Sequence, residues 1–202
     1  MGVKWLCFDT ENDHPLLPGA GIWPVEAVRH YIHHSGGVRR DRPIQMICAA
    51  VYDFESDRLF EFRMNRPDEK AALLKLMCKA KELVSHSGQV CDLTIMEETY
   101  GPQALAPLRK VPHYDLFDPE NIASLDDLAR KHLSPAHCGA LEQQYRDRLA
   151  EGNERWPEYR PGMRDNAWYD DGKLAKAVWD VKKTVAIYRA RMTLERAAAA
   201  KY

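Results

Sequence analysis

Residues 3–11 of the chain read VKWLCFDTE, a mostly apolar run that ends in two carboxylates one residue apart. A short run rich in Val, Trp, Cys and Phe favours a buried β-strand over a helix. Because side chains alternate along a strand, Asp9 and Glu11 are expected to point to the same side. Two such carboxylates repel each other unless a cation neutralises them, and Mg²⁺ prefers carboxylate oxygen. The alternative is that Asp9 caps the next segment and Glu11 is solvated.

The composition around this strand is that of a soluble globular protein, with 202 residues, 45% hydrophobic and 29% charged. The sequence predicts an α/β fold in which three antiparallel strands lead into parallel ones, flanked by helices. We expect residues 1–202 to form a single domain with insertions at about 12–43 and 134–166.

Charge and cysteine content exclude several classes of protein. A net charge of −1 argues against a generic nucleic-acid coat, although positive potential can be local. No apolar run reaches the length of a membrane span, and the first residues do not resemble a secretion signal. The five cysteines are scattered and odd in number, which is typical of reduced thiols. We therefore expect a cytoplasmic location with no membrane partner.

Residues 12–43 are expected to form a long connection, because Pro and Gly interrupt them throughout. A phosphate-gripping flap is one interpretation, with Trp23 or Tyr31 available to stack on a base. A solvated loop is the other, and a His-based metal site would need a further ligand. The polar residues concerned are His14, His30, His33, His34, Arg39, Arg40 and Arg42.

The remaining elements follow from periodicity and turn residues. Residues 44–52 and 58–63 are predicted to form a hairpin beside the first strand, and Ser124 with Asp127 indicates a capping box at the start of a helix. We further expect short strands at 83–85 and 112–117, helices at 69–81, 92–100, 140–149 and about 172 to near the end, and a loop at 152–165.

Two further carboxylates, Asp92 and Asp180, are candidates to join Asp9 and Glu11. Asp92 follows a strand and a small-residue turn, so it is either a helix cap or a third acid brought to the edge where Asp9 and Glu11 lie. Asp180 lies in the last predicted helix between apolar neighbours, although a mid-helix Asp is disfavoured by propensity and often faces solvent.

Taken together, these motifs resemble the DEDD superfamily of 3′–5′ exonucleases, which includes polymerase proofreading domains and has a ribonuclease-H-like fold. The motifs are DTE at 9–11, SGQVCDL at 87–93 and DVKKTVAIY at 180–188, with SLDDLA at 124–129 between them. Trp168, Tyr169, Gly172 and Lys173 are similar to residues of exonuclease-like domains carried beside bacterial helicases. The resemblance implies a mixed five-stranded sheet flanked by helices.

Phosphodiester cleavage needs an activated water and a stabilised leaving oxyanion, which two divalent ions roughly 4 Å apart can supply. The resemblance implies two Mg²⁺ or Mn²⁺ ions, with Asp9 bridging both. It implies Glu11 and Asp180 on the ion beside the attacking water, and Asp92 toward the leaving-group ion. The expected substrates are single-stranded DNA or RNA 3′ ends. The residues expected to contact them are Thr10, His86, Ser87, Arg39 and Arg40.

The chain departs from the family pattern at several positions. Ser87 stands where the family usually has Asn, and Cys91 where it usually has Phe. Lys176 and Ala175 occupy the positions of the Tyr or His that orients the attacking water. Lys176 lies one helical turn from Asp180, so three roles are open: a base with a depressed pKa, a phosphate ligand, or an ion-pair partner that displaces a metal. Tyr169 or a loop histidine is an alternative substitute.

Three hypotheses follow. The first is a metal-dependent 3′–5′ exonuclease with Asp9, Glu11, Asp92, Asp180 and Lys176 as its catalytic residues. The second is a catalytically inactive module that binds nucleic acid or a protein partner. The third is a domain that docks to a larger replication or repair assembly, with Trp156, Trp168 and Tyr169 as anchors.

Overall fold

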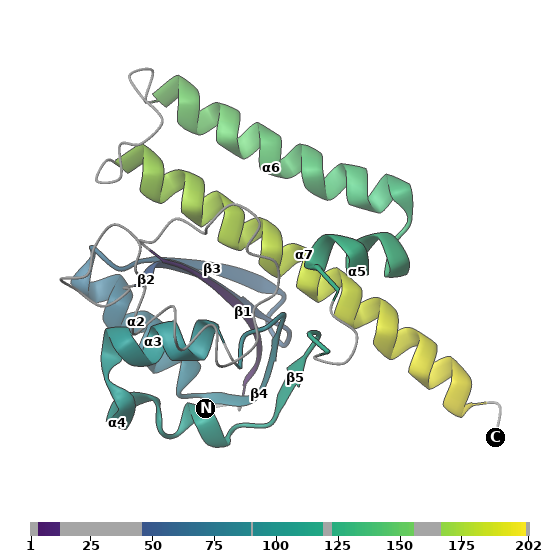
Figure 1. Ribbon diagram of the computed structural model, residues 1–202, viewed down its shortest axis with the longest axis horizontal. Helices are drawn as coiled ribbons and strands as arrows, with labels where there is room; N and C mark the ends of the chain where they lie inside the picture. Colours follow the sequence, from purple (N-terminus) through teal and green to yellow (C-terminus); the bar gives the residue numbers. More distant parts are fainter. Residues whose placement is uncertain (1–3, 13–45, 90, 119–122, 156–166, 201–202) are drawn as a thin grey trace.

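The computed structural model describes residues 4–12, 46–89, 91–118, 123–155 and 167–200. Their centre is a five-stranded sheet in the order β3-β2-β1-β4-β5 (Figure 1). β1 pairs antiparallel with β2 and parallel with β4, so the sheet changes direction at its central strand. The strands are β1 (Lys4–Asn12), β2 (Met46–Asp53), β3 (Arg58–Arg63), β4 (Ala80–Ser85) and β5 (His113–Asp115). The predicted α/β class and mixed five-stranded sheet are confirmed, and the arrangement is consistent with a ribonuclease-H-like fold.

Helices cover both faces of this sheet. One apolar core contains side chains of α2 (Pro67–Met77), α3 (Asp92–Tyr100), α4 (Pro102–Leu105) and the 3₁₀ turn η1 (Leu108–Lys110). The opposite core contains side chains of α7 (Ala167–Ala199). Figure 1 shows α7 crossing the sheet, with α6 (Pro135–Arg155) running beside it and α5 (Leu125–His132) packed near its middle. The sheet is thus the middle of three layers.

Alternate side chains of strand β1 belong to the two apolar cores on opposite faces of the sheet. Leu6 and Phe8 belong to the core under α2 and α3, whereas Cys7 belongs to the core under α7. Because this alternation has a period of two, Asp9 and Glu11 share the face of Cys7 and look toward α7. Thr10 shares the opposite face and looks toward α3. The strand register therefore decides which helix each polar residue at the end of β1 can meet.

Several predicted elements match the structure closely. The hairpin is formed by β2 and β3, with β3 at the predicted residues, and α3 spans the predicted residues 92–100. The capping box at the start of α5 is present, because Ser124 Oγ accepts from the Asp127 N–H and the Asp127 carboxylate accepts from the Ser124 N–H.

Several helix boundaries were predicted wrongly. The helix predicted at 69–81 ends at Met77, because Ala80 already pairs with Lys4 as the first residue of β4. Residues 140–149 are only the middle of α6, whose first turn is capped by Ser134 Oγ accepting from the His137 N–H at 3.2 Å. The segment 134–155 is therefore mostly regular helix.

The last helix also begins earlier than expected, at Ala167 instead of about residue 172. The predicted connection at 12–43 lies outside the described residues except for Asn12, and so does the predicted loop at 152–165 beyond Arg155. That residues 1–202 form one domain stays a prediction. Among the helices of the described ranges, none is long and apolar enough to cross a bilayer.

Candidate metal centre

Three carboxylates converge where β1 passes under α7. Asp9 and Glu11 of β1 and Asp180 of α7 each offer an oxygen, and these oxygens all lie within 4.8 Å of one another. The period of the strand brings the first two to the α7 face, as expected from the sequence, and the packing of α7 supplies the third. Asp180 therefore does not face bulk solvent, since its side chain is only 13% exposed.

Asp92 approaches the same strand from the other side. It is the first residue of α3, while the N-cap position belongs to Cys91, so the predicted alternative of a simple helix cap is wrong. Its Oδ1 accepts from the Thr10 backbone N–H at 2.8 Å and from Thr10 Oγ1 at 2.6 Å. Asp92 is buried next to the end of β1 but is not one of the three residues whose oxygens lie within 4.8 Å of one another.

The turn before Asp92 is held in an uncommon conformation. Ser87 has a φ of 63°, in the left-handed region that Asn tolerates better than Ser. Gly88 packs so closely on Ser85 that an added Cβ would lie 2.3 Å from the Ser85 Oγ. Asp115 of β5 fixes the turn by accepting from the N–H groups of Ser87 and Gln89 at 2.6 and 3.1 Å.

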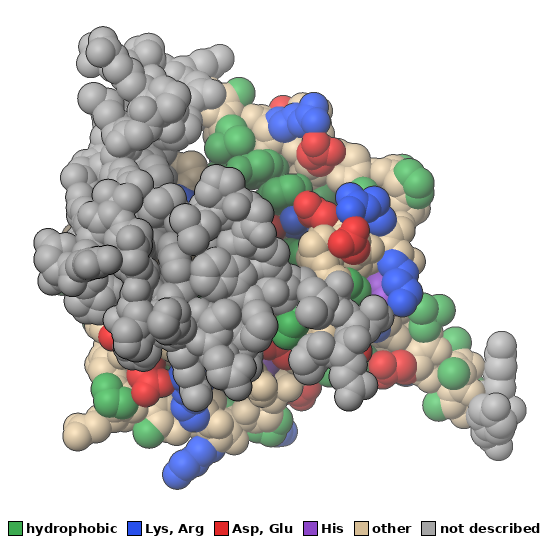
Figure 2. Space-filling model, in the orientation of Figure 1, with side chains coloured by type: hydrophobic (Ala, Val, Ile, Leu, Met, Phe, Trp, Pro, Cys, Tyr) green, Lys and Arg blue, Asp and Glu red, His purple; other side chains and the backbone are tan. Residues whose placement is uncertain are grey.

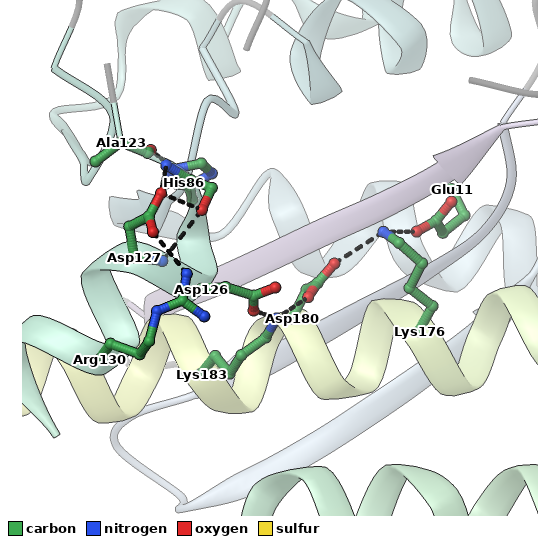
Figure 3. A network of polar contacts seen from close by, with 10 residues as sticks. Glu11, His86, Ala123, Asp126, Asp127, Arg130, Lys176, Asp180 and Lys183 are labelled. Carbon is green, nitrogen blue, oxygen red and sulfur yellow. Dashed lines mark hydrogen bonds and ion pairs between the residues drawn. The ribbon is translucent and has the colours of Figure 1, made fainter. Parts of the chain in front are cut away.

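Lysine ammonium groups neutralise one side of the acidic cluster. Figure 3 shows Lys176 reaching from α7 to Glu11 and Asp180, with its Nζ 2.5 Å from Glu11 Oε1 and 2.9 Å from Asp180 Oδ2. Lys173 Nζ lies 3.1 Å from Glu11 Oε2. Lys183 Nζ lies 2.8 Å from Asp180 Oδ1 and, on its other side, 2.8 Å from an oxygen of Asp126.

These ion pairs set the protonation of Lys176. Burial lowers the pKa of its ammonium, but the charges of Glu11, Asp180 and Asp9 outweigh burial and hold the pKa well above its ordinary value. A general base would need the opposite shift. The raised pKa does not support a general base in this arrangement, and the ion-pair role is the one observed.

The carboxylates divide by the sign of their pKa shifts. Burial tends to raise the pKa of Asp180, but Lys176 and Lys183 hold it below its ordinary value. Burial raises the pKa of Asp9, and the charges of Asp92 and Asp180 raise it further. Burial likewise raises the pKa of Asp92 to about 7, although its hydrogen bonds from Thr10 oppose the rise.

Asp9 also has a polar atom without compensation. Its Oδ2 is buried and has no hydrogen-bond partner among the described residues. A buried carboxylate oxygen is seldom left in this state in a folded protein, because its desolvation is then uncompensated. The donor set of Asp9, Glu11, Asp92 and Asp180 consists of hard oxygens, which suits Mg²⁺ or Mn²⁺. The residues present therefore fit a divalent cation.

The residues predicted to contact nucleic acid have different surroundings. Thr10 is buried and donates to Asp92, which makes it part of the support of the acidic centre. His86 Nε2 lies 3.1 Å from the Ala123 carbonyl oxygen, which joins the turn after β4 to the segment before α5 (Figure 3). The Ser87 backbone N–H is engaged by Asp115. Arg39, Arg40, the loop histidines and the side chain of Tyr169 lie outside what the structure describes.

Sequence reasoning missed three residues beside the centre. Lys173 and Lys183 lie two turns before and one turn after Asp180, so helical spacing alone would have placed them on its face. Tyr145 of α6 stacks on Trp179 with ring centroids 4.5 Å apart, and Lys183 Nζ lies 3.4 Å from the Trp179 ring centroid. Burial raises the pKa of Tyr145. The charge of Lys176 lowers this pKa and the charge of Asp180 raises it.

Comparison with known proteins gives little beyond this geometry. The chain is similar to the family B DNA polymerase from the hyperthermophilic archaeon Pyrobaculum calidifontis, with a TM-score of 0.46 and 15% sequence identity. The match covers 94% of this chain and 24% of the polymerase chain, so this chain corresponds to a minor part of the polymerase's length. No family model and no curated protein matches the chain.

Proposed function

We propose that the protein is a metal-dependent 3′–5′ exonuclease that hydrolyses single-stranded nucleic acid from its end. The observation that carries this proposal is the convergence of Asp9, Glu11 and Asp180 around a buried Asp9 oxygen that has no partner among the described residues. The order of the sequence motifs supports the direction of cleavage. A divalent ion bound there would supply an activated water and charge stabilisation at the scissile phosphate.

The residues of the chain have separable tasks in this proposal. Asp9, Glu11, Asp92 and Asp180 hold Mg²⁺ or Mn²⁺, and Thr10 fixes Asp92 through two hydrogen bonds. Lys176, whose side chain is 37% exposed, is available to a phosphate oxygen as well as to its carboxylate partners. On the face seen in Figure 2, acidic and basic side chains of the described residues are interspersed, in keeping with a net charge of −1. Substrate attraction therefore depends on the local charges of the centre.

A second candidate is a catalytically inactive module of the same fold that binds nucleic acid or a protein partner. The ion pairs of Lys176 with Glu11 and Asp180 favour it, because the ammonium occupies the space between two of the expected ligands. The two candidates differ in their dependence on Asp9. Cytoplasmic location and membership of a replication or repair assembly stay predictions under either one.

The test is degradation of 5′-labelled single-stranded and 3′-recessed oligonucleotides, of DNA and RNA in parallel, with Mn²⁺, Mg²⁺ or EDTA. We expect a ladder that shortens from the 3′ end and disappears in EDTA and in Asp9→Asn. The matched control is Asp147→Asn, because Asp147 is an exposed aspartate of α6 that accepts a surface hydrogen bond from Gln143. Intact oligonucleotide from folded wild-type protein with every metal would refute the exonuclease and leave the binding module.

A further inference from the structure

The two sides of the acidic centre differ in how their charge is balanced. All four carboxylate oxygens of Glu11 and Asp180 contact a lysine ammonium, supplied by Lys173, Lys176 and Lys183. Across the centre, no ion pair joins Asp9 or Asp92 to a lysine or arginine of the described chain. Asp9 Oδ2 has no partner there, and Asp92 Oδ1 accepts from the neutral N–H and hydroxyl of Thr10.

Lys176 is placed as a bridging cation would be. Its Nζ touches one oxygen of Glu11 and one of Asp180, which come from different elements, at 2.5 and 2.9 Å (Figure 3). The ammonium is tethered to α7 one helical turn before Asp180, so it is present at this position without binding from solution. A divalent ion that bound between Glu11 and Asp180 would have to displace it.

The neighbouring lysines make such displacement unfavourable. Lys173 and Lys183 hold the outer oxygens of the same two carboxylates, and their side chains are only 19% and 6% exposed. Both are therefore poorly screened by water, and each would repel a second divalent ion. The Asp9 and Asp92 side has the buried Asp92 carboxylate and a buried oxygen of Asp9, and no lysine or arginine of the described chain forms an ion pair with either.

We propose that the centre takes a single divalent ion, on the side of Asp9 and Asp92, and that the Lys176 ammonium provides the positive charge between Glu11 and Asp180 in place of a second ion. This inference rests on the metal dependence of the proposed function. It narrows the proposed function, in which all four carboxylates hold metal, and it differs from the two ions that the sequence resemblance implies. The ammonium can stabilise negative charge on a phosphoryl oxygen, but it cannot lower the pKa of a water as a metal does, so water activation falls to the one bound ion.

The experiment counts Mn²⁺ on the full chain. Free Mn²⁺ is followed by its electron paramagnetic resonance signal during titration, and the bound ions are examined for the spin coupling that a pair of adjacent ions shows. We expect one uncoupled ion per wild-type chain, lost in Asp9→Asn, and two ions per chain in Lys176→Met. The matched control is Lys182→Met, since Lys182 lies on the same helix and bonds Gln144 instead of a carboxylate of the centre.

Each outcome decides between the inference and the proposed function. Two coupled ions on the wild type would overturn the inference while leaving the metal-dependent nuclease intact. One ion on a Lys176→Met chain that keeps the wild-type circular dichroism would also overturn it. No Mn²⁺ bound to folded wild type would overturn the proposed function itself. Should Lys176→Met not fold, the wild-type count and Lys176→Arg, which keeps the charge and is expected to bind one ion, still decide.

Discussion

Asp53 is a buried aspartate of β2, Asp9 of the neighbouring strand β1 is half-buried with one buried oxygen, and the surroundings of the two carboxylates are opposite. Asp53, at the end of β2, accepts from Lys4 Nζ, from Ser56 Oγ at 2.8 Å and from the Glu55 N–H at 3.0 Å. Burial raises its pKa, but these bonds outweigh burial and lower it overall. Asp9 has a buried oxygen without a partner in the described chain and a raised pKa. Burial of a carboxylate is therefore no sign of function by itself, whereas burial without compensation is.

The largest effect expected from this contrast is on activity. Asp9→Asn keeps the shape of the side chain but removes a ligand charge, so exonuclease activity should fall at least about 10³-fold. Asp53→Asn should keep full activity per folded molecule. Single-turnover digestion of a labelled oligonucleotide, normalised to the folded fraction, measures both. Comparable losses of activity in the two variants would contradict the contrast drawn between Asp9 and Asp53.

Stability should respond in the reverse order. Asp53→Asn removes the acceptor of a buried ion pair and its local hydrogen bonds, so the free energy of unfolding should fall by about 2–3 kcal/mol. The control is Asp57→Asn in the same hairpin, because Asp57 is exposed and Asn tolerates its φ of 52°. Its expected change is within about 0.5 kcal/mol. Urea unfolding of metal-free protein gives these values, and an equal loss in both variants would contradict the role of Asp53.

Bound metal should stabilise the folded protein only when Asp9 is present. Mn²⁺ at about 100 times its dissociation constant should raise the free energy of unfolding by about 2.7 kcal/mol in the wild type and in Asp53→Asn. Asp9→Asn should show no such gain. Thermal melts with and without Mn²⁺ measure the shift, with EDTA-treated samples as the baseline. A full gain in Asp9→Asn would place the ion elsewhere.

The smallest expected effect is on the pH dependence of metal-free stability. Asp9 and Asp92 have raised pKa values in the folded chain, that of Asp92 about 7, so each destabilises the fold once it ionises. For Asp92 the penalty is absent below the unfolded value of about 4 and complete above about 7. Between about pH 6 and pH 7, the wild type should lose on the order of 1 kcal/mol through Asp92 relative to Asp92→Asn. Parallel denaturation curves at several pH values test this prediction. If the free energy of unfolding of the wild type rose with pH relative to that of the variant, the predicted sign would be wrong.

The parts of the fold that the sequence predicted are those with strong local signals. The β2–β3 hairpin, the start of α3 at Asp92 and the Ser124 capping box each depend on residues adjacent in sequence. The end of α2 was missed because residues 78–81 continue a helical composition. Only the pairing of Ala80 with Lys4 in three dimensions makes Ala80 the first residue of a strand. A local pattern cannot report a partner that lies more than 70 residues away.

The candidate site follows the same rule: the residues marked by local patterns were predicted, and those that depend on tertiary contacts were not. The convergence of Asp9, Glu11 and Asp180 follows from strand alternation together with recognisable motifs. The role of Lys176 as an ion-pair partner was one of three alternatives, and tertiary contacts were needed to choose it. Tyr145 lies inside the helix predicted at 140–149, but its stack on Trp179 was missed because only tertiary packing brings α6 against α7. The start of α6 was also missed, although Ser134 followed by Pro135 is a helix start signal.

The stack between α6 and α7 has a practical consequence. Trp179, one residue before Asp180, has Tyr145 against one part of its ring system and the Lys183 ammonium over its ring. Indole fluorescence depends on charges and aromatic groups in contact with the ring. The Lys183 ammonium contacts both the Trp179 ring and the Asp180 carboxylate. A cation that binds Asp180 should therefore shift this ammonium and alter the fluorescence emission of Trp179. The molecule thus carries its own optical reporter of what binds at its acidic centre, and no dye or tag is needed to read it.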